Sequence, residues 1–260
     1  LDYFEQSLKL RQQFHDTANI VKTLNNLGVI SQIAGDFDQA LAYLRRSLIF
    51  KMQLNDTLST AKTLNNIGVI YKDVGKLTDA QRFLTQALQR YRWVNDSSGI
   101  AAALNNLGQV AEGMGNIDSA LIYFESSLEI KRQIGDRRGL ANTLNNIGLI
   151  YGNQGKTDEA LKHFTEAMVI RRQLNDNFGL ASVMNNMANL YLTMGENRKA
   201  LELFRNSLMI SRSENLLGVT LRNYAGISGY FEKTGRSDSA LFYHKLYASL
   251  KDTIFNQDLK

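Results

Sequence analysis

Five pairs of adjacent asparagines recur at intervals of forty residues in this chain of 260 residues. The pairs are Asn25 and Asn26, Asn65 and Asn66, Asn105 and Asn106, Asn145 and Asn146, and Asn185 and Asn186. A carboxamide both donates and accepts hydrogen bonds, and the backbone of an extended peptide offers the same two groups. Each bond contributes a net ~0.5 to 1.5 kcal/mol. The pattern predicts a ladder of amides that holds a peptide regardless of its side chains.

A structural role for the asparagines is the alternative. Asparagine is ~0.6 kcal/mol less favourable than alanine inside a helix, so the five pairs together cost on the order of 6 kcal/mol. Bonds to a neighbouring repeat would offset that cost, or duplication could have copied the pairs without selection. Duplication alone is disfavoured because a nearby position has diverged, as Val29, Val69, Gln109, Leu149 and Asn189. Which asparagine of each pair is structural stays open.

No arrangement of side chains indicates catalysis. The three histidines (His15, His163 and His244) are far apart in the sequence, and there is no cysteine. Neither a phosphate-binding glycine loop nor a nucleophile elbow occurs. We therefore expect no enzymatic activity, no cofactor and no metal site. The net charge of +5 is mild for this length, so we expect no nucleic-acid partner.

The elements that carry the asparagines are predicted to be pairs of helices. Apolar residues recur at helical spacing, first at Leu64, Ile67 and Ile70, and then at Phe83 and Leu84. A glycine that suits a helix end separates the two groups, at 35, 75, 115, 155, 195 and 235. Aspartates that suit a helix start precede four of the first helices, at Asp56, Asp96, Asp136 and Asp176. Each forty-residue unit is therefore a helical hairpin, and a series of hairpins predicts a solenoid.

Small residues at fixed places identify the kind of solenoid. Gly28, Gly68, Gly108, Gly148 and Ala188 stand in the first helices, and Ala40, Ala80, Ala120, Ala160, Ala200 and Ala240 in the second. With Leu44, Leu84, Phe124, Phe164 and Phe204, they resemble the tetratricopeptide repeat (TPR) pattern. The resemblance implies an all-α, right-handed superhelical solenoid of about 13 helices in antiparallel pairs. The forty-residue period exceeds the usual ~34, which predicts a longer second helix or connection.

The repeat phase divides the chain. We expect residues 1–16 to be the second helix of a truncated repeat, within a longer protein. Five repeats then occupy residues 17–56, 57–96, 97–136, 137–176 and 177–215. Residues 216–260 form a degenerate sixth repeat, in which Ala225 and Gly226 replace the asparagine pair, and a helix that leaves the array.

The TPR resemblance also implies where a ligand binds. It places the asparagine pairs on or beside the concave groove, which would receive a protein or an extended peptide. Lys22 and Lys62 lie one turn before a pair, at a position that also faces the groove, and could receive a carboxylate. The alternative is that they are solvated surface lysines. The chain lacks the third-unit cations of the two-carboxylate clamp, since Ala102 and Asn106 occupy those places.

The LNNIGxIY units and the closing YHKLYASLKDTIFNQ resemble the TPR sensor segment of bacterial membrane-anchored histidine kinases and LuxR-type regulators. The resemblance implies a ligand-sensing segment outside the cytoplasmic membrane, and a dimer through the C-terminal helix in the parent protein. The sequence itself shows no membrane span. A soluble cytoplasmic scaffold that joins protein partners is the alternative. RNA binding by basic residues late in the second helices is a third hypothesis, with Trp93 as the only supporting aromatic residue.

Overall fold

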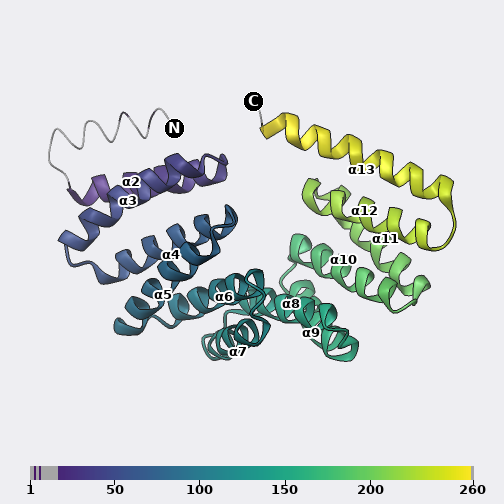
Figure 1. The fold of residues 1–260 in the computed structure, drawn as a ribbon, viewed down its shortest axis with the longest axis horizontal. Coiled ribbons are helices and arrows are strands. Elements are labelled where there is room, and N and C mark those ends of the chain that lie inside the picture. Colours follow the sequence, from purple (N-terminus) through teal and green to yellow (C-terminus); the bar gives the residue numbers. More distant parts are fainter. Residues whose placement is uncertain (1–2, 4–5, 7–16, 259–260) are drawn as a thin grey trace. The chain divides into compact units, whose positions relative to one another are not determined.

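The computed structural model describes the backbone of residues 3, 6 and 17–258 and, within the range 17–258, the side chains of residues 19–254. These residues form twelve α-helices and no strand, in two compact units, Leu1–Gly135 and Asp136–Lys260 (Figure 1). Unit 1 contains α2 (Thr17–Ile33), α3 (Phe37–Gln53), α4 (Thr57–Asp73), α5 (Leu77–Trp93), α6 (Ser97–Gly113) and α7 (Ile117–Gln133). Unit 2 contains α8 (Arg137–Asn153), α9 (Thr157–Gln173), α10 (Asn177–Thr193), α11 (Asn197–Ser213), α12 (Leu217–Lys233) and α13 (Ser237–Asp258). The all-helical fold and the pairing of consecutive helices are confirmed. The further helix expected over residues 1–16 falls almost entirely outside the described residues.

The aspartates cap the helices, as predicted. The side chain of Asp56 accepts a hydrogen bond from the backbone N–H of Ser59 at the start of α4. Asp96, Asp136 and Asp176 do the same at the starts of α6, α8 and α10. Leu216 precedes α12 and provides no such cap.

The connections explain the forty-residue period. Each helix from α2 to α12 has 17 residues, and three residues separate it from the next. First and second helices are equally long, so the residues beyond the usual period are shared between the two helices and do not lie in the second helix or its connection alone. The middle residue of each connection is left-handed, for example Gly75 with φ 76° and Asn55 with φ 52°. Asparagine tolerates this conformation better than most residues, because its short polar side chain can bond locally.

Close packing within each pair depends on the small residues of the first helices. A Cβ atom on Gly68 would lie 2.6 Å from Cγ of Leu84, and one on Gly108 would lie 2.7 Å from Cδ1 of Phe124. Leu84 and Phe124 are fully buried. The glycines therefore let the second helix approach the first at the centre of the core, as predicted.

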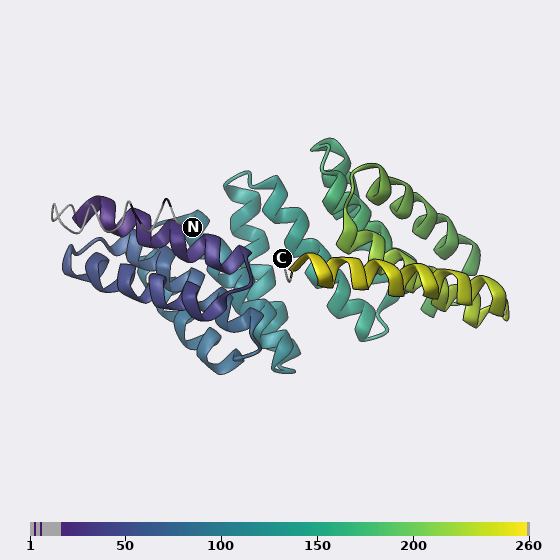
Figure 2. The ribbon, with the colours of Figure 1, turned by 90° about the horizontal axis from the view of Figure 1, so that it is seen from above.

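The first helices also contact each other between repeats. Within unit 1, α4 packs against α6, and within unit 2, α10 packs against both α8 and α12. Figure 2 shows the helix pairs from above. The last helix, α13, has 22 residues and packs on α12. These contacts bring asparagine pairs of neighbouring repeats together within each unit.

Candidate functional site: the asparagine face

In each unit the asparagine pairs form a surface on the first helices, here called the asparagine face of that unit, and each of the two faces contains a direct bond between repeats. Asn106 Nδ2 donates to Asn65 Oδ1 at 3.1 Å, and Asn186 Nδ2 donates to Asn145 Oδ1 at 2.8 Å. In both cases the second asparagine of one pair bonds the first asparagine of the preceding pair. A carboxamide has two N–H donors and two acceptor lone pairs, so each bonded amide keeps capacity for a ligand.

Other amides of these pairs have no bond to any side chain or backbone group that the structure describes. The amides of Asn26, Asn66 and Asn146 have no hydrogen-bond partner among the described residues. Asn26 is exposed, and Asn66 and Asn146 are half-buried, as are Asn25, Asn65, Asn105, Asn106, Asn145 and Asn186. Polar groups in such positions remain accessible to water or to a bound molecule.

Asn185 differs from the other nine. It is 2% exposed, and its Nδ2 donates to Oδ1 of Asn223 at 2.8 Å. Asn223 Nδ2 in turn donates to Ser207 Oγ at 2.7 Å. A peptide could reach Asn185 only by breaking this buried network, whose unsatisfied groups would cost about 1 to 3 kcal/mol each. We therefore assign Asn185 a structural role and leave it out of the proposed contact surface.

The predicted lysines and the first asparagine pair come together around one pocket. Lys22, Asn25, Asn26 and Lys62 line a cavity of about 460 Å³ between the first and second repeats. Lys22 and Lys62 are exposed. The only acidic side chain in the lining is that of Asp56, which caps α4. The pocket therefore has a positive balance of charge.

A third lysine, Lys51 of α3, completes this pocket and was not predicted. It is 6% exposed, and its Nζ donates to Thr63 Oγ1 at 2.6 Å and to Asn25 Oδ1 at 3.4 Å. Burial lowers the pKa of Lys51, and the charge of Lys62 lowers it further, although Asp56 acts in the opposite direction. The repeat pattern could have pointed to Lys51, because long basic side chains occupy the same place in three repeats, at Lys51, Lys131 and Arg171.

The equivalent side chains at the second, third and fourth junctions, Tyr91, Lys131 and Arg171, are also long and buried. Arg171, 5% exposed, donates to Asp176 and to Asn142. Burial tends to raise the pKa of Asp176, but bonds from the Gly179 N–H and from Arg171 outweigh it and lower that pKa. At the second junction the residue is Tyr91, and burial, with the charge of Asp96, raises its pKa to about 12. Lys51, Tyr91 and Arg171 thus each connect a second helix with the first helix of the next repeat.

The described residues contain no cluster of three or more metal-ligating side chains. Within the same part of the chain, no helix combines the length and the apolar character that crossing a membrane requires.

Comparison with known proteins agrees with the geometry. The sequence pattern of the tetratricopeptide repeat matches residues 59–133 and 139–213, and a second tetratricopeptide repeat pattern matches residues 21–51. No curated protein matches the chain in sequence.

Several solved structures share the fold. BtubC (BKLC) from P. vanneervenii is 17% identical with a TM-score of 0.71, over 84% of this chain and 92% of that one. Aspartyl phosphate phosphatase F from Bacillus subtilis is 13% identical with a TM-score of 0.78, over 96% of this chain and 64% of that one. The Rap conjugation gene regulator of plasmid pLS20, in complex with the Phr* peptide, is 16% identical with a TM-score of 0.71, over 94% and 77%. At these identities the likeness shows the fold alone. With its helix pairs, packing glycines and matched repeats, the chain belongs to the tetratricopeptide repeat family.

Proposed function

We propose that this chain is a peptide-binding module, in which the asparagine face of each unit holds extended peptide through its backbone. The observation that carries the proposal is the set of amides at Asn26, Asn66 and Asn146 that have no hydrogen-bond partner in the part of the chain that the structure describes. Each can donate to a peptide carbonyl and accept from a peptide N–H. The solved Rap regulator in complex with the Phr* peptide supports the proposal, because it shows a protein of this fold with a peptide bound.

The pocket beside the first asparagine pair favours an acidic group on that peptide. Lys22 and Lys62 would provide charge at its mouth, and the buried Lys51 ammonium stands next to Asn25. A carboxylate there would offset the mutual repulsion of the lysines. Hydrogen bonds between charged groups contribute more than neutral ones, about 1.5 to 3 kcal/mol.

The proposed place of this module is the ligand-sensing segment of a bacterial signal-transduction receptor, outside the cytoplasmic membrane. What supports it is the sequence resemblance, together with the extended α13 helix, which would lead to the output part and pair with its copy in a dimer. Ligand would then have to favour one of two global states of the array. The proposal assigns no enzymatic activity to the chain, since the likeness to the phosphatase is one of fold.

Peptide binding is tested with a displayed library of ten-residue peptides, followed by titration of the strongest synthetic binder. Asn66→Ala and Asn146→Ala should each weaken binding about two- to tenfold. The melting temperature should stay the same or rise slightly, because neither amide has a hydrogen-bond partner among the described residues and alanine has the higher helix propensity. Asn206→Ala on α11, which removes the same amide from a second helix, is the matched control. Methylating backbone nitrogens of the peptide should weaken binding more than changing its side chains. A melting temperature that falls while affinity holds would sink the proposal.

The receptor role needs a separate test. The gene on either side of the sequence should encode a membrane span of ~20 apolar residues and an output domain. A cytoplasmic protein without such a span would support the scaffold alternative and leave peptide binding intact.

A further inference from the structure

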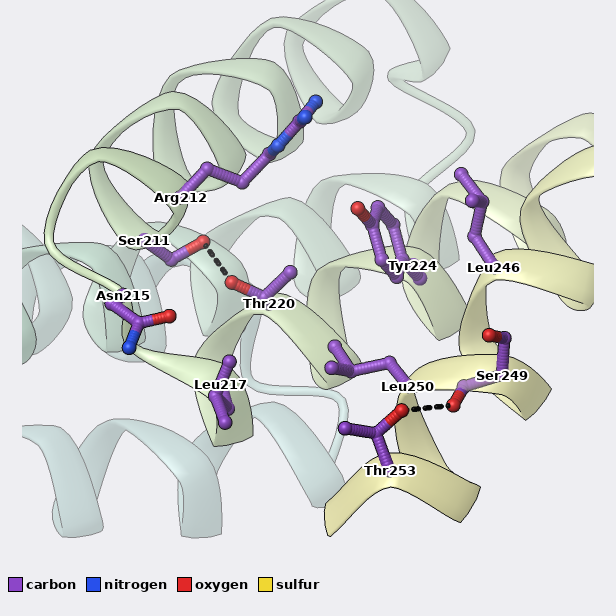
Figure 3. Close-up of a pocket in the computed structure, with 10 residues that line it drawn as sticks. All are labelled: Ser211, Arg212, Asn215, Leu217, Thr220, Tyr224, Leu246, Ser249, Leu250 and Thr253. Carbon is purple, nitrogen blue, oxygen red and sulfur yellow. Dashed lines mark hydrogen bonds between the residues drawn. The ribbon is translucent and has the colours of Figure 1, made fainter.

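A second cavity lies in unit 2, apart from the asparagine face. It occupies about 320 Å³ between the end of α11, the start of α12 and the second half of α13 (Figure 3). Ser211, Thr220, Tyr224, Leu217, Leu246 and Leu250 form most of its wall. None of the predicted asparagines or lysines takes part.

A short side chain at the repeat junction accounts for the space. Ser211 stands where the earlier junctions have Lys51, Tyr91 and Arg171, all 6% exposed or less. The ring of Tyr91 covers Gly99, and the side chain of Arg171 covers Gly179, so closely that neither glycine could carry a Cβ atom. A serine cannot extend across the first turn of α12 in this way. The short side chain of Ser211 therefore leaves space open beside the start of α12, although Val219 stands there where the earlier repeats have Gly99 and Gly179.

The inner end of the cavity is polar and fixed. Ser211 is fully buried and Thr220 is 5% exposed, and Thr220 Oγ1 donates to Ser211 Oγ at 3.0 Å. Asn223 Nδ2 also donates to Ser211 Oγ at 3.4 Å, in addition to its hydrogen bond to Ser207 Oγ. Thr220 uses its only hydroxyl proton on Ser211, so its oxygen offers lone pairs to a ligand. A hydroxyl held by such a network is preorganised as an acceptor.

The rest of the described lining consists of apolar side chains, uncharged polar side chains and one charged side chain, that of Arg212. Leu217, Leu246 and Leu250 provide aliphatic walls (Figure 3). Leu246 is specific to this place, because the equivalent residues of the other second helices are Arg46, Gln86, Ser126, Glu166 and Asn206. Among the described residues of the lining, Arg212 alone is charged, so the cavity disfavours a cation.

We propose that this cavity binds a small uncharged molecule with an apolar body of one or two rings and a single N–H or O–H donor directed at Thr220. Its volume is at the lower end of the range for small-molecule sites, which begins near ~300 Å³. The leucines and the Tyr224 ring would remove the apolar body from water, and the threonine oxygen would orient it. The site is independent of peptide binding at the asparagine face.

Indole and 1-methylindole are suitable probes, because both have the same two-ring system but only indole has an N–H donor. Titration into the full 260-residue chain, followed through the methyl NMR signals of Leu246 and Leu250, should give saturable shifts with both. Thr220→Val keeps the shape but removes the acceptor, so it should weaken indole roughly two- to tenfold and leave 1-methylindole unchanged. Equal losses for both probes, or no saturable shift at all, would overturn the proposal.

A pair of arginine substitutions tests the location. Ser211→Arg restores the kind of side chain found at Arg171 and should abolish the shifts by filling the cavity. Ser213→Arg adds the same charge at an exposed position two residues away and should have no effect. Circular dichroism checks that both variants are folded. If Ser211→Arg does not fold, the Thr220→Val comparison alone decides. Indole that still binds a folded Ser211→Arg variant would refute the assignment.

Discussion

Asn106 of the third repeat donates a hydrogen bond to Asn65 of the second, across 41 residues of sequence, through two half-buried side chains. The same bond joins Asn186 to Asn145 in unit 2. No such bond joins Asn66 to Asn25, which accepts from Lys51 instead, and Asn66 has no hydrogen-bond partner among the residues that the structure describes. One repeated motif thus makes bonds between repeats in some places and leaves amides available in others.

The bond between Asn65 and Asn106 should give a measurable coupling energy. We expect a double-mutant cycle of Asn65→Ala and Asn106→Ala, followed by urea unfolding, to show about 0.5 to 1.5 kcal/mol. The cycle cancels the gain in helix propensity that each alanine brings. The matched cycle of Asn25→Ala and Asn66→Ala should give a coupling near zero. Equal couplings in the two cycles would contradict the assigned bonding.

The charge of Asp176 should matter much more than that of Asp96. Both residues cap a first helix, but Asp176 also accepts from the buried Arg171, whereas Asp96 lies beside Tyr91. Asp176→Asn keeps a capping oxygen and leaves the guanidinium without a counter-charge. We expect its free energy of unfolding to fall by about 3 to 5 kcal/mol, against less than about 1 kcal/mol for Asp96→Asn. Chemical denaturation measures both, and similar losses would show that Arg171 does not need the carboxylate.

Stability should fall in acid, partly through Asp56 and Asp176. The bond from the backbone N–H of Ser59 lowers the pKa of Asp56, and the pKa of Asp176 is also lowered. A carboxylate whose pKa is lower in the folded state stabilises fully above its unfolded value, here 3.8, and this contribution disappears as the pH falls through the folded pKa. The free energy of unfolding should therefore decrease below about pH 4.

The variant Asp176→Asn isolates one part of that acid sensitivity. Its stability should depend less on pH below about 4 than that of the unmodified chain. Burial raises the pKa of Glu112, so its contribution to stability changes with pH in the opposite direction. That contribution is the same in both proteins and cancels when their pH profiles are compared. Parallel pH profiles for the two proteins would show that Asp176 is not linked to acid unfolding.

The close approach at Gly108 should be intolerant of one added carbon. In Gly108→Ala the new Cβ would stand 2.7 Å from the Phe124 ring, so the helices must separate, which costs about 1 to 3 kcal/mol. Gly229 of α12 has no atom within 4 Å of an added Cβ. Gly229→Ala should therefore stabilise the chain by up to about 1 kcal/mol, through helix propensity. Thermal unfolding of the two variants should show melting temperatures that change in opposite directions.

The local features of the fold could be read from the sequence. Asp56 and its equivalents were identified as caps, Gly75 and its equivalents as helix ends, and Gly108 as a packing position. Each of these roles depends on the nearest few residues or on a contact within one hairpin, because a helix bonds its backbone four residues along the chain. The period of forty residues then repeats the hairpin and indicates the family. The length of the helices was less certain, and the additional residues proved to be shared equally between both members of a pair.

The asparagine face was decided by tertiary structure. Asn65 and Asn66 are neighbours of the same type, yet within the described part of the chain only Asn65 has a hydrogen-bond partner. Asn185 is buried, while Asn145 is half-buried. Whether one amide bonds another depends on the distance between two first helices, because the two bonded asparagines are 41 residues apart in sequence. The burial of Lys51 and the open space beside Ser211 likewise depend on three helices at once. A repeat in the sequence determines which side chains recur, but packing between repeats decides which of them are left free to bind.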